Sequence, residues 1–597
     1  MEHVITAIKP DLAAPRHWIE PGIRLSSGCG SAKVTLRHKR LRGASGAMST
    51  DVKRRKHARV GMRASTLPGA NLCIVALLAS PLPVYAQTSS TQGSPTQISP
   101  SQTPAQTVAT SVPPAQIDAA IARLDEIAIG IQRRSQVPGM AMAVVRDGRV
   151  VYAKGFGVRR AGEDVRVDSD TVFQLASLSK SLSATVVAHQ VGAGAIQWDT
   201  PLVSHLPWFA LSDPWVTSHV TLADMFSHRS GLPDHAGDDL EDLGYDRTQI
   251  LERLGYLPLN SFRNSYAYTN FGLTAAAEAV AVAAGTDWAS LADRTLYRPL
   301  GMASTSSRFS DFLARTNRAS AHVRINGAFV PGPQRQPDAQ APAGGASASV
   351  TDLSRWMILI LNGGLMDGRP FVPNDALLPA MRAEVISSPS RTADARPSFY
   401  GYGIGVSISS TGRVALDHSG AFAMGAGTTY RLVPSLGLGI AVLTNAQPVG
   451  AAEAIVAEFM DQVELGQSSR DWYAAYSQAM APLLAPVGSL AGKSPPPHAA
   501  APAPLHLYAG RYENPYFGAA VVSLAEGDLI LALGPDETRR FTLSHWDGNT
   551  FAFVPTGENE PAGSRTAVVF AQSGSEAADE LSIDFLNTEG MGHFMRR

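Results

Sequence analysis

The sequence predicts an α+β protein, in which an antiparallel sheet is flanked by helices, interrupted by an all-helical insert and followed by a small all-β barrel. Strand-like runs occur near residues 140–157 and again at 402–445, and the sequence between them is mostly helical. Strands at both ends of this part predict one sheet joined across the chain. Beyond residue 504, short alternating runs separated by Gly-Asp, Asp-Gly and Glu-Gly turns predict the barrel.

Length and composition indicate a globular chain of several domains. The 597 residues are too many for one compact core, and 45% hydrophobic against 17% charged residues suffices for a large one. The net charge of −1 gives no reason to expect a nucleic-acid partner. Cys29 and Cys73, the only cysteines, both precede the predicted mature chain, so neither a disulfide framework nor a cysteine metal site is expected there.

Residues 1–86 are predicted to be a targeting region with a signal peptide. A basic stretch at 53–59 precedes an apolar run at 72–79, which is too short to span a bilayer. We expect cleavage after Ala86 and a periplasmic or secreted protein. A buried N-terminal helix is the alternative, but residues 87–113, rich in Gln, Ser, Thr and Pro, follow at once and predict a disordered linker.

Individual elements can be placed in the predicted catalytic domain, residues 114–465. Apolar residues at helical spacing predict a helix over 117–132, and Asp147-Gly148 between two apolar runs predicts a hairpin, because both residues tolerate positive φ. Ser349 is expected to cap a helix that closes on glycines. Further expectations are strands at 402–409, 428–434 and 438–445, a helix at 451–463, a helix and Ala/Pro-rich linker at 466–504, and the barrel at 505–597.

A rare lysine points to the chemistry. After Ala86 the chain has only Lys154, Lys180 and Lys493, and arginine supplies nearly all other positive charge. Arginine cannot give up its proton in a protein, whereas a lysine with a lowered pKa can act as a base. On a helix Lys180 would share a face with Ser177, as a base and its nucleophile require. Ser-x-x-Lys is nevertheless a short pattern that recurs by chance, and the neighbouring serines are expected on the helix surface without a role: Ser179, Ser181 and Ser183.

Two further motifs follow in order. Tyr268-Thr269-Asn270 precedes a predicted helix, and His418-Ser419-Gly420 precedes a predicted strand. Together with Ser-x-x-Lys, this order resembles the serine β-lactamase and penicillin-binding-protein superfamily, nearest to the class C-related branch of D-aminopeptidases, D-stereospecific peptidases and esterases. The segments 226–235 and 343–356 look like linking segments of that branch. The resemblance covers about residues 116–462.

The resemblance implies a role for each matching residue. Ser177 matches the acylated nucleophile, Lys180 the base that deprotonates it, and Tyr268 the phenol that passes a proton to the leaving group. Since a phenol has a pKa of about 10, we expect nearby cations such as Lys180 and His418 to favour its phenolate. No metal or other cofactor is implied.

Substrate binding is implied at four further positions. Asn270 matches the amide that contacts the lysine and the substrate, and Gly420 the glycine that lets substrate lie against its strand. The backbone N–H groups of Ser177 and Ala421 match the oxyanion hole. His418 stands where β-lactamases carry a lysine, which argues against strong β-lactam turnover. A purely structural His418 is the alternative, and the neighbouring Asp417 either raises the pKa of this histidine or points to the other face of the strand.

The segment from residue 505 resembles the lipocalin-like domain of some of these peptidases, with 508–515 as its opening. Such a domain caps the active site, mediates homo-oligomers or binds a ligand, and the sequence does not choose among these. The acids in 234–249 are expected to form a solvated face, with selection of cationic substrates as the alternative.

The leading functional hypothesis is a serine hydrolase that acts through a Ser177 acyl-enzyme on small amides or esters, including D-amino-acid peptides. A β-lactamase and a slowly acylating penicillin-binding or wall-binding protein are the alternatives. The partners expected are a small-molecule or peptide substrate and cell-wall fragments.

Overall fold

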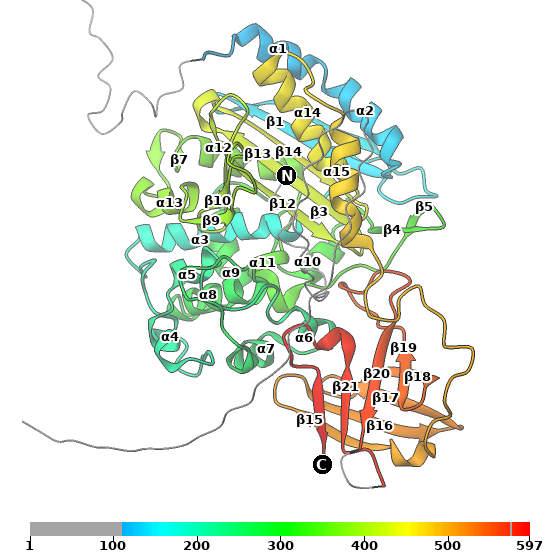
Figure 1. Cartoon of the computed structure of the whole chain (residues 1–597). Coiled ribbons are helices and arrows are strands. Elements are labelled where there is room, and N and C mark those ends of the chain that lie inside the picture. The colour runs from blue at the N-terminus through cyan, green and yellow to red at the C-terminus, as the bar shows by residue number, and fades with distance from the viewer. Residues whose placement is uncertain (1–109, 573–575) are drawn as a thin grey trace, which may run out of the picture. The chain divides into compact units, whose positions relative to one another are not determined.

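The computed structural model describes residues 110–572 and 576–597, so the predicted signal peptide, both cysteines and linker residues 87–109 lie outside the described residues. An eight-stranded antiparallel sheet forms its centre, in the order β2-β1-β14-β13-β12-β11-β10-β9 (Figure 1). The predicted fold class is confirmed. The strands are β1 (Gly139–Arg146), β2 (Arg149–Gly157), β9 (Val385–Ser388), β10 (Ser398–Tyr400), β11 (Gly405–Ile408), β12 (Val414–Phe422), β13 (Ala426–Val433) and β14 (Leu438–Thr444).

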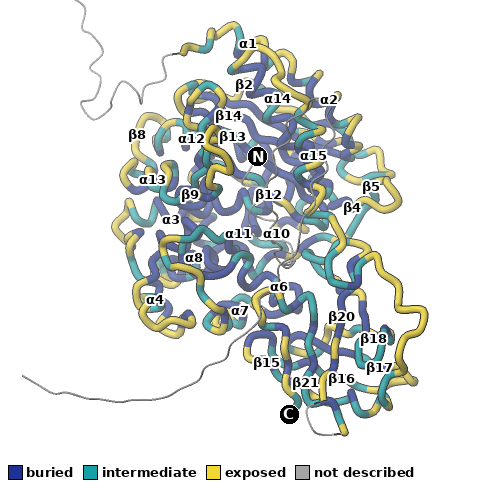
Figure 2. The backbone as a smooth tube through the Cα atoms, in the orientation of Figure 1, coloured by how far each residue is buried: buried dark blue, intermediate teal, exposed yellow. Residues whose placement is uncertain are grey.

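Helices cover both faces of this sheet, because its central strands are apolar on both sides. Alternate residues of β1, such as Met140 and Met142, join a core with α1, α2 and α14, whereas Ala141 and Ala143 join the core beneath α12. Figure 2 shows the central strands as buried and the outer surfaces of the covering helices as more exposed. These helices are α1 (Pro114–Ala122), α2 (Leu124–Ser135), α12 (Val350–Leu361), α14 (Ala451–Leu465) and α15 (Trp472–Met480).

Local signals in the sequence identified the turns and caps correctly. Asp147 and Gly148 have φ of 49° and 74°, as the predicted hairpin between β1 and β2 requires. The Ser349 side chain accepts the Asp352 N–H and caps α12, which is followed by a left-handed glycine at 363. The helix predicted over 117–132 forms as α1 and α2, which meet at Arg123.

The insert between β2 and β9 is mainly helical and also contains three short two-stranded sheets, β3–β6, β4–β5 and β7–β8. Its helices are α3 (Ser179–Gly192), α4 (Pro214–His219), α5 (Leu222–Phe226), α6 (Asp238–Asp242), α7 (Arg247–Arg253), α8 (Asn270–Ala283), α9 (Trp288–Ala292), α10 (Phe309–Ala314), α11 (Ala341–Gly344) and α13 (Asn374–Met381). Its strands are β3 (Phe173–Gln174), β4 (His322–Ile325), β5 (Ala328–Pro331), β6 (Ser347–Ala348), β7 (Leu365–Met366) and β8 (Arg369–Pro370). Within the described residues, no helix combines the length and apolarity needed to cross a membrane.

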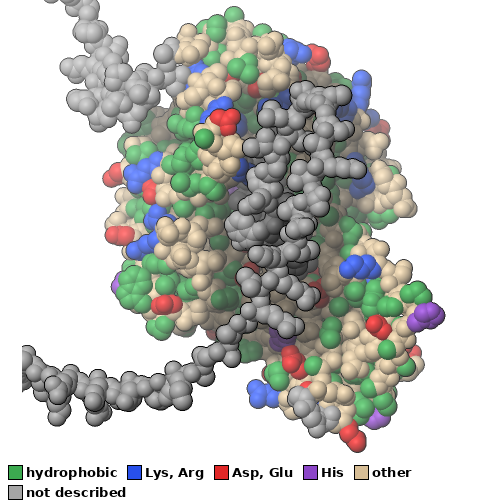
Figure 3. Space-filling model, in the orientation of Figure 1, with side chains coloured by type: hydrophobic (Ala, Val, Ile, Leu, Met, Phe, Trp, Pro, Cys, Tyr) green, Lys and Arg blue, Asp and Glu red, His purple; other side chains and the backbone are tan. Residues whose placement is uncertain are grey.

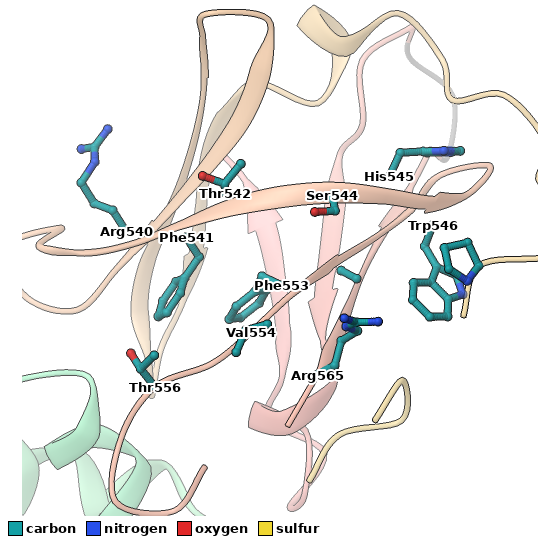
Figure 4. A pocket seen from close by; sticks show the side chains of 12 residues that line it. Arg540, Phe541, Thr542, Ser544, His545, Trp546, Phe553, Val554, Thr556 and Arg565 are labelled. Carbon is teal, nitrogen blue, oxygen red and sulfur yellow. The ribbon is translucent and has the colours of Figure 1, made fainter. Parts of the chain in front are cut away.

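The C-terminal segment is a closed eight-stranded barrel. Its interior is filled by side chains, among them Tyr512, Phe551 and Phe570, which pack ring against ring. A cavity of about 490 Å³ lies beside β18 and β19, where Phe541 packs on Phe553 (Figure 4). The strands are β15 (Gly510–Asn514), β16 (Gly518–Ala525), β17 (Asp528–Leu533), β18 (Arg539–Asp547), β19 (Thr550–Phe553), β20 (Thr566–Ala571), β21 (Glu580–Ile583) and β22 (His593–Arg596).

Candidate active site

Ser177 lies on a tight turn between β3 and α3. The residue before it, Ala176, has a φ of 47°, a left-handed conformation that is strained for any residue but glycine. Strand β12 packs directly against this turn. A Cβ atom at Gly420 would lie 2.4 Å from the Leu175 carbonyl oxygen and 3.0 Å from the Ser177 nitrogen. Glycine at 420 therefore lets β12 approach the turn that carries the serine.

The side chains of Lys180 and Tyr268 meet at the Ser177 hydroxyl, and Asn270 joins them through Lys180. Oγ of Ser177 lies 3.1 Å from Nζ of Lys180 and accepts a 2.8 Å hydrogen bond from the Tyr268 hydroxyl. Nζ of Lys180 also lies 2.6 Å from Oδ1 of Asn270 and 3.1 Å from the Ala343 carbonyl oxygen. Residues 90 positions apart in the chain, at the start of α3 and of α8, thus share one polar cluster.

Lys180 is completely buried. Burial lowers the pKa of its amine from 10.5 to about 7, and the negative charge of Asp238 opposes part of that shift. Near neutral pH, a large fraction of this lysine is therefore the neutral amine, which has a lone pair available to accept a proton.

The buried Tyr268 behaves differently from the sequence expectation. Burial raises the pKa of its phenol well above 10, and the nearby acids Asp234 and Asp238 raise it further. Although Nζ of Lys180 lies 4.5 Å from the centre of the tyrosine ring, burial dominates and the net effect of the surroundings is to raise the phenol pKa. The expectation that neighbouring cations favour the phenolate is wrong, because the desolvation of an anion dominates here. The phenol is therefore protonated, and it donates its hydrogen bond to Ser177.

Asp238, at the start of α6, is a member of the cluster that the motifs did not reveal. Its carboxylate accepts hydrogen bonds of 2.9 and 3.2 Å from Nδ2 of Asn270 and lies 2.7 Å from Nδ1 of His235. These contacts fix the orientation of the Asn270 amide, so that its oxygen faces Lys180. Asp238 is only 5% exposed, which makes it an integral part of the site.

The acids of segment 234–249 were expected to form a solvated face, and for several of them this is wrong. The Glu241 side chain is only 8% exposed and lies 2.5 Å from Arg335, which is itself buried beside Phe422 at the end of β12. Glu558 lies 3.7 Å from the same arginine and accepts from the backbone N–H groups after β12, at residues 423 and 424. Burial raises the pKa of both glutamates to about 7. Two glutamates and Arg335 thus form a buried ionic cluster beside the end of β12.

His418 on β12 is nearly buried, 5% exposed, and faces the cluster. Its Nε2 lies 2.7 Å from the Tyr400 hydroxyl and its Nδ1 2.7 Å from the carbonyl oxygen of residue 419. The Asp417 carboxylate accepts from Ser407 and lies 3.7 Å from Arg431. Since successive side chains of a strand point to opposite faces, these contacts of Asp417 agree with the alternative in which the acid lies on the other face of the strand.

The serines along α3 are buried structural residues, so their expected place on a helix surface is wrong. Ser179 donates to the Ala176 carbonyl at 2.6 Å, Ser181 to that of Gly403 at 2.8 Å and Ser183 to that of Pro342 at 2.6 Å. These hydrogen bonds connect α3 to the turn before it and to two other segments of the chain. In the described part of the chain, no group of three or more His, Cys, Asp or Glu side chains is arranged to hold a metal ion.

Comparison with known proteins places this geometry in context. A family model described as Beta-lactamase matches residues 117–464, more than half of the chain, and one described as a domain of unknown function (DUF3471) matches residues 494–592. The unguisins hydrolase ungD′ of Aspergillus campestris is 26% identical over 430 residues, which are 68% of this chain and 78% of that protein.

Two further similarities agree with this match. Penicillin-binding protein 4 of Amycolatopsis lactamdurans is 28% identical over 322 residues, 53% of this chain and 82% of that protein. The solved structure of the octameric penicillin-binding protein homologue from Pyrococcus abyssi aligns with a TM-score of 0.51 at 17% identity, over 78% of this chain and 98% of that one. This last likeness concerns the fold alone.

Proposed function

Because the chain belongs to the β-lactamase family, whose relatives include hydrolases, we propose that it is a serine hydrolase that forms an acyl-enzyme on Ser177. The observation that carries this proposal is the position of the Ser177 hydroxyl between Lys180 and Tyr268, at 3.1 and 2.8 Å. A nucleophile between a neutral base and a proton donor is the arrangement that acyl transfer needs.

The hydrogen bonds around Lys180 indicate the direction of proton transfer. A neutral amine has two N–H donors and one lone pair. Asn270 Oδ1 and the Ala343 carbonyl oxygen are both pure acceptors, so they take the two N–H groups. The lone pair then faces the Ser177 hydroxyl, and Lys180 accepts the serine proton as Oγ attacks the substrate carbonyl.

The other groups complete the reaction. We assign the developing oxyanion to the backbone N–H groups of Ser177 and Ala421, which lie on the adjoining turn and strand. Tyr268, protonated because it is buried, gives its proton to the leaving amine or alcohol and recovers one from the Lys180 ammonium. Water then attacks the acyl-enzyme carbonyl while Lys180 accepts the water proton, and this proton passes to Ser177 Oγ as the bond between Oγ and the acyl group breaks. Asn270 holds the lysine and contacts the substrate.

Small amides and esters, including D-amino-acid peptides, are the proposed substrates. His418, bound to Tyr400, takes the substrate-binding place at which a permanent lysine cation would favour a carboxylate-bearing β-lactam. β-Lactam hydrolysis is therefore the second candidate. Slow acylation without turnover, which would make the protein a penicillin- or wall-binding module, is the third.

Turnover of three substrates tests the proposal. The mature chain, residues 87–597, is assayed with a D-alanine anilide, a short p-nitrophenyl ester and a chromogenic cephalosporin. Ser177→Ala is compared with Ser212→Ala, which alters an exposed serine. We expect hydrolysis of the anilide or ester to be lost only in the first variant. Preference for the cephalosporin would support the β-lactamase, and equal rates in both variants would refute the acyl-enzyme.

We also propose that the chain is exported, since a signal-peptide pattern precedes Gln87. A separate proposal is that the chain self-associates through its barrel. Charges of both signs are interspersed over the part of the surface that is coloured in Figure 3. Mass spectrometry of the secreted protein tests export, for which we expect an N-terminus at Gln87. Light scattering with and without residues 505–597 tests association, and a monomer in both cases would contradict it.

A further inference from the structure

His228 is a buried residue beside the site that the mechanism does not yet use. It follows α5 in the segment 226–235, is 1% exposed, and has a φ of 57°. This left-handed conformation is uncommon for a residue other than glycine, although histidine adopts it more often than most residues do.

His228 binds the residues on both sides of Tyr268. Its backbone carbonyl accepts the Ala267 N–H at 2.9 Å, and its side-chain Nδ1 accepts the Thr269 N–H at 3.2 Å. The His228 ring lies 4.6 Å from the Tyr268 ring and 5.0 Å from that of Tyr400, between centroids. Two backbone bonds and one ring contact from a single residue thus restrain the position of the tyrosine.

The Nδ1 contact requires a neutral imidazole. Because Nδ1 accepts a peptide N–H, the ring proton resides on Nε2. Burial lowers the pKa of His228 well below 6.5, and the positive charges of Lys180, His418 and His235 lower it further. Nε2 has no hydrogen-bond partner among the residues that the structure describes. The ring is therefore buried with one unpaired N–H, which is an unfavourable arrangement for a polar group.

We propose that His228 is a positioning residue that holds Tyr268 with its hydroxyl 2.8 Å from Ser177. The inference rests on the proposed function, in which Tyr268 supplies the proton to the leaving group. It assigns the essential contact to Nδ1, since that atom accepts the N–H of the residue directly after the tyrosine.

Two substitutions separate the acceptor from the ring. In His228→Asn, Oδ1 occupies the place of Nδ1, and asparagine tolerates positive φ better than most residues. In His228→Phe, the ring remains and the acceptor is lost. We expect kcat of the Asn variant within about 3-fold of wild type and kcat of the Phe variant lower by about 10²-fold, with KM unchanged, as for misplacement of a reacting group. His498→Phe, at an exposed position, is the matched control.

The outcomes are distinguishable. Wild-type kcat in the Phe variant, or equal losses in both variants, would overturn the inference. If Phe prevents folding, His228→Gly replaces it, because glycine adopts this φ without strain, and the same loss is expected. If wild-type protein hydrolyses none of the three substrates, the proposed function fails, and crystal structures of the variants decide instead. A Tyr268–Ser177 separation kept at 2.8 Å in the Phe variant would then refute positioning by Nδ1.

Discussion

Asp238 holds Asn270 through both carboxylate oxygens, at 2.9 and 3.2 Å from the same amide nitrogen. This contact orients the opposite side of the amide towards Lys180, whose Nζ lies 2.6 Å from Oδ1. The charge of Asp238 also opposes the lowering of the Lys180 pKa by burial. One acid on α6 thus influences both the geometry and the basicity of the base.

Asp238→Asn therefore changes rate and pH dependence together. Loss of a charge-assisted hydrogen bond is expected to reduce kcat by about tenfold. Without the negative charge, the Lys180 pKa falls further, so the acidic limb of kcat/KM moves to lower pH. Asp239→Asn, on the same helix, is the control and keeps the wild-type limb. A limb unmoved in Asp238→Asn would contradict the assigned electrostatic role.

The wild-type pH profile reports Lys180 directly. Its amine must be neutral to accept the serine proton, so kcat/KM is expected to rise with pH through an apparent pKa of about 7. Lys180→Arg cannot reproduce this, since arginine stays protonated, and we expect a loss of about 10²–10⁴-fold at every pH. A profile that is flat from pH 5 to 9 would show that another group is the base.

The lowered pKa of Lys180 also predicts how the free energy of unfolding depends on pH. The Lys180 pKa is about 7 in the folded protein and 10.5 for a free side chain, so between these values the unfolded chain binds the extra proton. Relative to Lys180→Met, wild type is expected to lose free energy of unfolding as pH falls from 10 to 7 and to lose no more below 7. Urea titrations of both proteins test this, and a difference that is constant with pH would contradict burial of the amine.

Gly420→Ala tests the approach of β12 to the nucleophile. The added methyl would meet the Leu175 carbonyl oxygen at 2.4 Å and the Ser177 nitrogen at 3.0 Å. Displacing an oxyanion donor is expected to lower kcat by about 10²–10³-fold. Gly130→Ala adds a methyl where nothing lies within 4 Å and serves as control. Full activity in Gly420→Ala would mean that the strand and the turn can separate without cost to the reaction.

The three ordered motifs of the sequence were sufficient to predict several residues of the candidate site. Ser177, Lys180 and Tyr268 were each predictable from these motifs, and the structure brings their side chains together. Asp238 was not, since it lies in a run of acids that looks solvated, and its contact with Asn270 depends on how α6 packs against α8. The buried serines of α3 were missed because hydroxyl groups paired to backbone carbonyls leave no apolar period.

The fold also contains elements that local sequence signals predict and elements that such signals do not predict. Strands and helices followed from apolar period, glycine turns and a capping serine, all of which are local signals. The pairing of β3 with β6 joins residues far apart in sequence through only two residues per strand. Pairs of that length have no periodicity to detect, so only the packed structure reveals them.

The central claim is a covalent bond between Ser177 and the acyl group of the substrate. The most direct test is intact-protein mass spectrometry of the mature chain, quenched in acid during turnover of a p-nitrophenyl ester and followed by peptide mapping. We predict a mass increase equal to the acyl group on the peptide that contains Ser177, absent from Ser177→Ala. Hydrolysis without any adduct, at a rate that Ser177→Ala does not change, would contradict the account.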